Sequence, residues 1–324
     1  ESGDITGVSL EIFKLIRANK KVMVGDSQQN IYSFNQTING FEALSNEGEQ
    51  LTLSQSFRVS TSLAPYVKEF CNTYLDPHMD FEGFPYKAMP DQKDITMFYI
   101  ARTNSGIISR MIELDLQGRR YNLTRPVYSI FALPLLLLRL NKTPDSEIRE
   151  PEFKFLEADM KEWMTNPDIR KTNESPLAYI LSQHSDDTNI SSAMNLLRKF
   201  SPWQIIQTYQ NAKSHEKSST TYKITITSAH SSKGLQADIV QIEPDLNEAL
   251  HKVIEKQQNA AKERLKADKE IYGNKFEFKY EKHALFNPVE PDMSLLPKDA
   301  VEEFRLYYVA VTRAKFQLQH AEWL

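Results

Sequence analysis

Cysteine and long apolar runs are nearly absent from this sequence. Cys71 is the single cysteine in 324 residues, which excludes an internal disulfide and is typical of a reducing compartment. The longest apolar run, residues 130–140, is interrupted by Pro134 and Arg139 and is shorter than the ~20 residues that span a bilayer. The first residues have neither the basic region nor the apolar stretch of a secretory signal. The expected protein is intracellular, in a prokaryotic or virus-infected cytoplasm or a nucleus, and not secreted.

Glycine is scarce, and neither sign of charge dominates. None of the ten glycines stands in the G-x-x-x-x-G-K-[ST] pattern of a phosphate-binding P-loop. The net charge is −4, with 39 basic and 43 acidic residues. A small net charge does not exclude nucleic acid, because a protein that tracks a strand needs only a locally basic channel. A hydrophobic fraction of 40% is that of an ordinary globular protein.

Hydrophobic periodicity predicts an α/β protein. Residues 8–19 have the spacing of an amphipathic helix and lead into a short apolar strand at 22–24, which is the pattern of a parallel sheet. Residues 141–220 are polar and helical in pattern, and 271–300 resemble a surface loop. Further strands are predicted at 51–53, 95–100, 222–227, 239–240 and 316–318, and further helices at 61–75, 246–270 and 302–310. The expected fold is therefore one α/β domain with a helical insertion.

Two polar segments in the first half follow predicted strands. Residues 25–34 place an acid and amides past a strand end, where α/β sheets bind ligands, and then alternate Tyr32 with Phe34. Exposed aromatics stack on unpaired bases, although a turn before a buried strand would have the same pattern. In residues 53–58, Arg58 follows a strand and has the fork geometry that suits phosphate, although taken alone a surface arginine in a loop is the better interpretation.

Two more polar segments lie near the end of the chain. Residues 227–236 form a turn of hydroxyl groups, His230, a lysine and a glycine, which offers donors to a phosphodiester backbone. A structural histidine is the more ordinary interpretation of that residue. Residues 303–315 predict a helix with Arg313 near its C-terminal end, where the helix dipole alone would favour an arginine.

In order and spelling, the four segments resemble the UvrD/Rep/PcrA class of superfamily 1A DNA helicases. Residues 25–34 have the Gly-Asp-x-x-Gln-x-Ile-Tyr-x-Phe of motif III, and 55–58 the Gln-Ser-Phe-Arg of motif IV. Residues 230–235 have the His-x-x-Lys-Gly-Leu of motif V, and 308–315 the Tyr-Val-Ala-x-Thr-Arg-Ala-Lys of motif VI. The resemblance covers nearly all of the chain, is weakest over 105–220, and is closest in spelling to the F-box DNA helicase branch.

The resemblance implies two RecA-like parallel-sheet lobes with a mainly helical insertion. Residues 1–50 would be the end of the first lobe, 51–140 and 221–324 the second lobe, and 141–220 the insertion. Residues 1–4 fit the last letters of the Asp-Glu-x-x-Asp motif II. The expected chain is therefore a fragment that begins within motif II, with the P-loop and the magnesium-binding aspartate upstream.

The resemblance also implies a function: ATP-dependent 3′-to-5′ translocation on single-stranded DNA and unwinding at duplex junctions, in DNA repair or recombination, with ATP and Mg²⁺ as cofactors. Four residues would be catalytic, with Glu1 as general base, Gln29 as the link between the γ-phosphate and DNA, and Arg58 and Arg313 as charge clamps. The other implied contacts are Phe57, Gly234 and Gln236 to ATP, and Tyr32, Phe34, Asn104, Ser228 and His230 to DNA.

Several positions depart from the family pattern. Asn35 stands where an arginine follows the stacking aromatic, and Gln236 where motif V has a glutamate. Phe57 keeps the ring of the usual tyrosine but loses its hydroxyl. A second hypothesis therefore stays open, in which a degenerate helicase domain serves as a non-catalytic module that binds DNA or protein.

Overall fold

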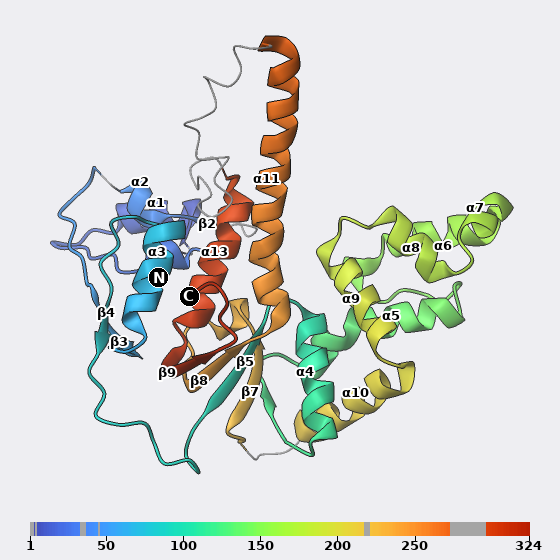
Figure 1. Ribbon diagram of the computed structural model, residues 1–324, viewed down its shortest axis with the longest axis horizontal. Coiled ribbons are helices and arrows are strands. Elements are labelled where there is room, and N and C mark those ends of the chain that lie inside the picture. The colour runs from blue at the N-terminus through green and yellow to red at the C-terminus, as the bar shows by residue number, and fades with distance from the viewer. Residues whose placement is uncertain (1–2, 4, 33–36, 45, 217–220, 273–295) are drawn as a thin grey trace. The chain divides into compact units, whose positions relative to one another are not determined.

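The computed structural model describes residues 3, 5–32, 37–44, 46–216, 221–272 and 296–324 (Figure 1). The chain divides into two compact units. The first unit combines residues 1–95 with residues 232–324, and the second is the continuous stretch Thr96–Ser231. These two units do not correspond one to one to the four expected segments, because they are defined by compactness and not by lobe. The boundaries of the expected lobes remain a prediction.

Parallel strands form the main sheet, as expected. It has five strands in the order β6-β7-β5-β8-β9. Most apolar residues of β5, β7 and β8 are buried, as is typical of a parallel sheet whose faces are covered by helices. The strands are β5 (Met97–Ala101), β6 (Asn122–Leu123), β7 (Ile224–Ser228), β8 (Ala237–Ile242) and β9 (Ala314–Gln319). The strands predicted at 95–100, 222–227, 239–240 and 316–318 are thus confirmed with small shifts, and the fold class is α/β.

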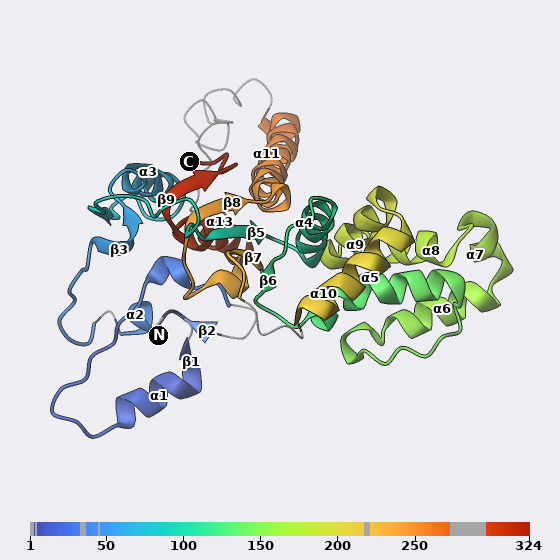
Figure 2. The same cartoon turned by 90° about the horizontal axis from the view of Figure 1, so that it is seen from below.

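Helices make up most of the second unit. One core cluster joins β5 and β7 to α4 (Asn104–Leu116), α5 (Val127–Lys142), α9 (Thr188–Lys199) and α10 (Pro202–Glu216). A second cluster joins the C-terminal half of α5 to α6 (Leu156–Thr165), α8 (Pro176–Gln183) and α9, with α7 (Pro167–Thr172) beside α6. Phe131 lies in the first cluster and Leu137 in the second, so α5 belongs to both (Figure 2). The helical character predicted for 141–220 is confirmed for the described residues.

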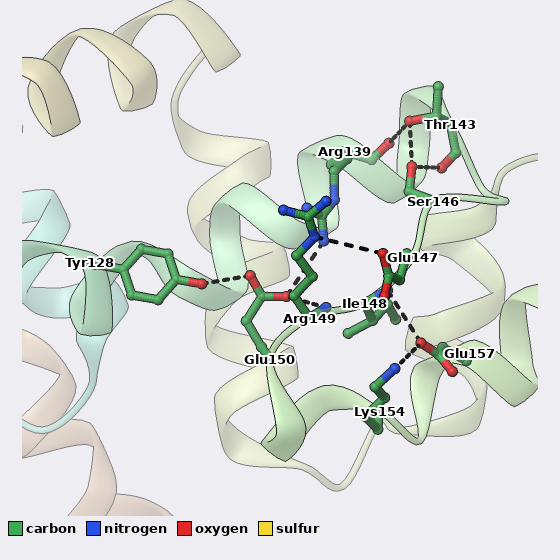
Figure 3. A network of polar contacts seen from close by, with 10 residues as sticks. All are labelled: Tyr128, Arg139, Thr143, Ser146, Glu147, Ile148, Arg149, Glu150, Lys154 and Glu157. Carbon is green, nitrogen blue, oxygen red and sulfur yellow. Dashed lines mark hydrogen bonds and ion pairs between the residues drawn. The ribbon is translucent and has the colours of Figure 1, made fainter.

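Polar contacts fix the connection that follows α5 (Figure 3). The Tyr128 hydroxyl donates to Glu150 Oε1 at 2.6 Å, and Arg139 Nη2 lies 3.5 Å from Glu150 Oε2. Burial raises the pKa of Glu150, but the hydrogen bonds from Tyr128 and the backbone, together with Arg139, outweigh it and lower the pKa overall. Glu150 directly precedes the short 3₁₀ helix η4 (Pro151–Phe153), so these bonds hold the turn toward α6.

Aromatic side chains form the core of the first unit around α13 (Lys298–Val311). This helix packs against α3 (Ala64–Tyr74) and α11 (Pro244–Tyr272), the long orange helix of Figure 1. Phe70 lies 5.3 Å from Tyr307 between ring centroids, and Tyr74 stacks on Phe304 at 5.1 Å. The predicted helices 61–75, 246–270 and 302–310 are therefore confirmed. The predicted loop at 271–300 lies largely outside the described residues.

Two small sheets complete the first unit. β1 (Ile5–Thr6) pairs antiparallel with β2 (Thr37–Ile38), which precedes the single turn α2 (Gly40–Ala43). β3 (Gln55–Ser60) pairs parallel with β4 (Glu82–Phe84). The strand predicted at 51–53 is wrong, because pairing with β4 begins only at Gln55 and Leu53 is 86% exposed.

The predicted helix and strand near the beginning are also changed. α1 (Gly7–Leu15) ends four residues before the predicted end, and the apolar face predicted to be buried is open, with Ile12 58% exposed. Residues 22–24 form no strand, and Val22 and Val24 are exposed. A strand requires a neighbour for its backbone hydrogen bonds, and no described residue pairs with 22–24. An apolar run alone was therefore not enough to predict a strand at 22–24.

Candidate functional site

Asp26 organises the first polar segment. It caps the short 3₁₀ helix η2 (Ser27–Gln29), and its Oδ1 accepts from the backbone N–H of Gln28 at 2.8 Å. An aspartate suits this position because its carboxylate satisfies a backbone donor that the helix start leaves unpaired. Its Oδ2 accepts from Gln29 Nε2 at 2.9 Å. The side-chain amide of Gln29 is thus held by the carboxylate that shapes the turn.

Helix α13 holds this turn from the other end of the chain. The Tyr308 hydroxyl donates to Asp26 Oδ2 at 2.9 Å, and Arg305 Nε donates to Gln28 Oε1 at 3.4 Å. Burial and the nearby Asp26 carboxylate raise the pKa of Tyr308 well above its ordinary value. The phenol therefore stays protonated and serves as a donor. Tyr308 and Arg305 lie one helical turn apart, so one face of α13 makes both contacts.

The polar segment at residues 227–236 contacts the Asp26 turn through Lys233. Its Nζ donates to the backbone carbonyl of Gln29 at 2.9 Å and lies 5.7 Å from the centre of the Tyr32 ring. Gly234 follows with φ +82°, a left-handed conformation that glycine adopts without strain. This turn brings the chain from Lys233 into β8. Segments that carry the spelling of motifs III, V and VI thus meet within the first unit.

Arg313 is fully buried at the end of α13. Its relative exposure is 0%, and its Nε donates to the carbonyl of Val309 at 2.7 Å. Its Nη2 donates to Thr312 Oγ1 at 2.9 Å. A helix leaves its last carbonyls without helical partners, and a basic side chain there satisfies one of them. The guanidinium also lowers the pKa of Tyr308, in opposition to the burial and Asp26 that raise it, so its charge acts on the group that holds Asp26.

Phe57 and Arg58 lie within β3, not after a strand as the sequence had suggested. Phe57 is 70% exposed, and its carbonyl accepts from the Tyr86 hydroxyl at 2.7 Å. Its ring lies 5.5 Å from that of Phe84 on β4. Arg58 is half-buried on the other face of the strand, as alternation along a strand requires. Gln236 is exposed, immediately before β8.

The carboxyl ends of β5 and β7 lie level in the second unit, and β6 ends two residues earlier in the register. Ala101 pairs with Ser228, and Leu123 pairs with Ile226. Asn104 opens α4 just after β5, behind the N-cap Thr103. Ser228 Oγ accepts from the backbone N–H of Ser231 at 3.2 Å, and His230 begins η5 (His230–Ser232). Asn104, Ser228 and His230 therefore share the edge at which parallel sheets bind ligands.

Two residues of the expected site, Glu1 and Phe34, lie outside the described residues. The sequence interpretation assigned no role to Tyr308, Arg305 or Lys233. A tyrosine among apolar positions of a helix was the available signal for Tyr308, because a buried hydroxyl requires a partner. Nothing in the sequence indicated which partner.

With this geometry described, comparison with known proteins gives one match. Residues 170–320 match the family model of the UvrD-like helicase C-terminal domain. No curated protein matches the chain. The matched residues include Lys233, Arg305, Tyr308 and Arg313, whereas the Asp26 turn precedes them. A RecA-like fold is the one expected of such a domain, and the parallel α/β sheet agrees with it.

Two features are absent from the part of the chain that the structure describes. No described helix combines the length and apolarity needed to cross a membrane. The described residues also bring together no group of three histidine, cysteine or acidic side chains that could hold a metal ion.

Proposed function

We propose that this chain forms part of an ATP-dependent 3′-to-5′ DNA helicase. The observation that carries the proposal is the junction of three motif-bearing segments at the Asp26 turn. Tyr308 and Arg305 from α13 and Lys233 from the turn before β8 all bond to residues 26–29. A motor that couples nucleotide state to a DNA strand needs such direct links between its nucleotide-sensing and strand-binding segments.

In this proposal each segment has a chemical task. Gln29 links the γ-phosphate to DNA, and Glu1 is the general base for the attacking water. Arg58 and Arg313 stabilise the negative charge that develops on the transferred phosphoryl group. The exposed ring of Phe57 stacks on adenine, with Gly234 and Gln236 at the sugar. Tyr32, Phe34, Asn104, Ser228 and His230 contact single-stranded DNA.

The residues of this chain could hold the base and one phosphate of a nucleotide, but not its whole triphosphate. Exposed Phe57 and half-buried Arg58 lie on one strand, which suits a base and a phosphate of one molecule. The 324 residues contain no P-loop pattern, and the described ones offer no metal-binding group. When bound, ATP supplies the phosphoryl group for hydrolysis. Its β- and γ-phosphates and Mg²⁺ require a P-loop and an aspartate from outside this sequence.

ATP turnover tests this proposal in a polypeptide that supplies a P-loop ahead of Glu1. Arg58→Ala should lower DNA-stimulated turnover by about 10³-fold or more, because arginine clamps contribute that much to phosphoryl transfer. Its affinity for single-stranded DNA should change little. Arg119→Ala, which removes an exposed arginine of the second unit, is the control and should keep full turnover. Near-normal turnover in Arg58→Ala would show that this arginine is structural.

One observation favours the second candidate, a non-catalytic DNA-binding module. Arg313 is fully buried and its guanidinium bonds to its own helix, so it must change rotamer to reach a phosphate. A module of this kind would bind single-stranded DNA without DNA-stimulated turnover, even when a P-loop is supplied. The same turnover assay therefore separates the two candidates.

A further inference from the structure

Arg125 is a half-buried cation at the carboxyl edge of the sheet in the second unit. It lies two residues after the end of β6. Its Nη2 donates to Asn104 Oδ1, and Asn104 Nδ2 in turn donates to the carbonyl of Ser129 at 3.4 Å. Its Nε is buried and has no hydrogen-bond partner among the described residues. The guanidinium of Arg125 is thus held by Asn104 at Nη2, while its buried Nε has no hydrogen-bond acceptor among the described residues.

The strand order places this guanidinium across the end of β7. β7 lies between β6 and β5, and β6 ends two residues before the level ends of β5 and β7. The Thr124 hydroxyl bonds to that of Thr227 at 2.7 Å, which holds the end of β6 against the end of β7. Since Arg125 leaves β6 and Asn104 follows β5, their contact passes over the segment that continues from β7 through Ser228 to His230.

Among the described residues of the second unit, no carboxylate forms an ion pair with Arg125. The Glu216 carboxylate contacts a residue near Arg125 in the sequence. Its Oε1 accepts from the backbone N–H of Val127 at 2.9 Å. Its Oε2 lies 3.6 Å from Lys213 Nζ. The acceptor that Arg125 has is the neutral amide of Asn104. Burial without an anion lowers the pKa of Arg125, so the site gains from an added negative charge.

We infer that Arg125 binds a backbone phosphate of single-stranded DNA at this edge, beside Asn104, Ser228 and His230. Arginine suits this role because its planar fork can keep the bond to Asn104 while it donates to phosphate oxygens. The contact is independent of base sequence, because phosphates carry no sequence information. The inference rests on the proposed function, since it adds a residue to the DNA site proposed there.

The salt dependence of binding tests the inference on the whole chain. A fluorescein-labelled oligothymidylate is titrated with wild-type protein and with Arg125→Gln between about 0.05 and 0.3 M salt. Loss of one phosphate contact should make the slope of log affinity against log salt less negative by about 0.7. That slope corresponds to about eightfold weaker binding at 0.05 M salt and about twofold at 0.3 M. An oligoadenylate should show the same ratios.

Matched variants separate charge from position. Arg120→Gln removes the same charge from an exposed residue that precedes β6, at the opposite edge of the sheet, and should leave the slope unchanged. Arg125→Lys should keep the slope and lose part of the affinity. Asn104→Ala should weaken binding without changing the slope, because an amide carries no charge. An unchanged slope in Arg125→Gln would overturn the inference and reduce Arg125 to a support for Asn104.

A measurement on the unmodified protein covers the case in which Arg125→Gln fails to fold. Phenylglyoxal modification of arginines, read by peptide mass spectrometry, should show Arg125 protected by the oligonucleotide and Arg120 not protected. Equal modification of Arg125 with and without DNA would refute the contact. If the wild-type chain binds no single-stranded DNA, the proposed function itself fails, an outcome distinct from binding with an unchanged slope.

Discussion

Arg313 combines a buried charge with hydrogen bonds to the end of its own helix. Arg313→Ala leaves the Val309 carbonyl and the Thr312 hydroxyl without this donor inside a closed core. A hydrogen bond to a charged group contributes about 1.5–3 kcal/mol, so the free energy of unfolding should fall by about that amount in urea titrations. Arg58→Ala, at a half-buried position, should lower it less. A loss in Arg313→Ala no larger than that in Arg58→Ala would contradict this account.

Tyr308 predicts how stability changes at alkaline pH. Its pKa in the folded protein is raised above the value in the unfolded chain, so its contribution is fully present below pH ~10 and is lost as pH rises above it. Wild-type protein should therefore become less stable between pH 9 and 11. In Tyr308→Phe the free energy of unfolding should be lower by about 1 kcal/mol at pH 8 and should fall less steeply above pH 10.

Urea unfolding at pH 8, 9.5 and 11 measures both effects of Tyr308→Phe. The buried phenols of Tyr121 and Tyr307 have raised pKa values too, so part of the alkaline slope will remain in the variant. Identical slopes in wild-type protein and Tyr308→Phe would show that this phenol ionises as readily in the folded chain as in the unfolded chain.

At the scale of elements, the turn between η5 and β8 depends on one glycine. Gly234 has φ +82°, and a Cβ there would meet no atom within 4 Å, so any cost of Gly234→Ala comes from the backbone conformation alone. That cost should be about 1 kcal/mol or more in the free energy of unfolding. Gly7→Ala, at the start of α1 with equally open space, is the control and should be neutral or slightly stabilising. A melting temperature that falls equally in both variants would contradict this account.

The connection after α5 should respond to acid. Because the pKa of Glu150 is lowered in the folded protein, its contribution is present above its ordinary pKa of 4.5 and is lost as pH falls below it. Glu150→Gln should therefore lower the melting temperature at pH 7, and this deficit should shrink as the pH is lowered toward 3 and the carboxylate becomes protonated. Glu152→Gln, an exposed neighbour, is the control and should change neither value. A deficit of Glu150→Gln that persists at pH 3 would instead indicate a steric cause.

The elements that the sequence predicted correctly are those whose partners lie within the described chain. β5, β7, β8 and β9 each have a paired neighbour, so their apolar runs were sufficient evidence. The runs at 22–24 and 51–53 looked the same locally, but pairing depends on what lies beside a strand. The motif sequences also singled out the polar segments. They could not predict the hydrogen bond from Tyr308 to Asp26, because these residues lie 282 positions apart in the sequence.

At the scale of the whole molecule, the 324-residue chain alone should not hydrolyse ATP. It contains Arg58, Arg313 and Gln29, but its sequence has no P-loop to hold the β- and γ-phosphates. Phosphate release by the purified chain should equal the background, with or without single-stranded DNA. DNA-stimulated turnover by this chain would require a phosphate cradle of another kind.

The first unit is built from two segments separated along the chain by the whole second unit. On the ribosome, residues 1–95 emerge before Thr96–Ser231 but cannot acquire their α13 contacts until that stretch and most of the remainder have been synthesised. At about 5–20 residues per second this delay is on the order of ten seconds, during which Phe70 and Tyr74 lack their partners on α13. The continuous second unit needs no such wait and can fold as soon as it emerges. Vectorial synthesis should therefore favour folding of the second unit first, with chaperone demand concentrated on the first 95 residues.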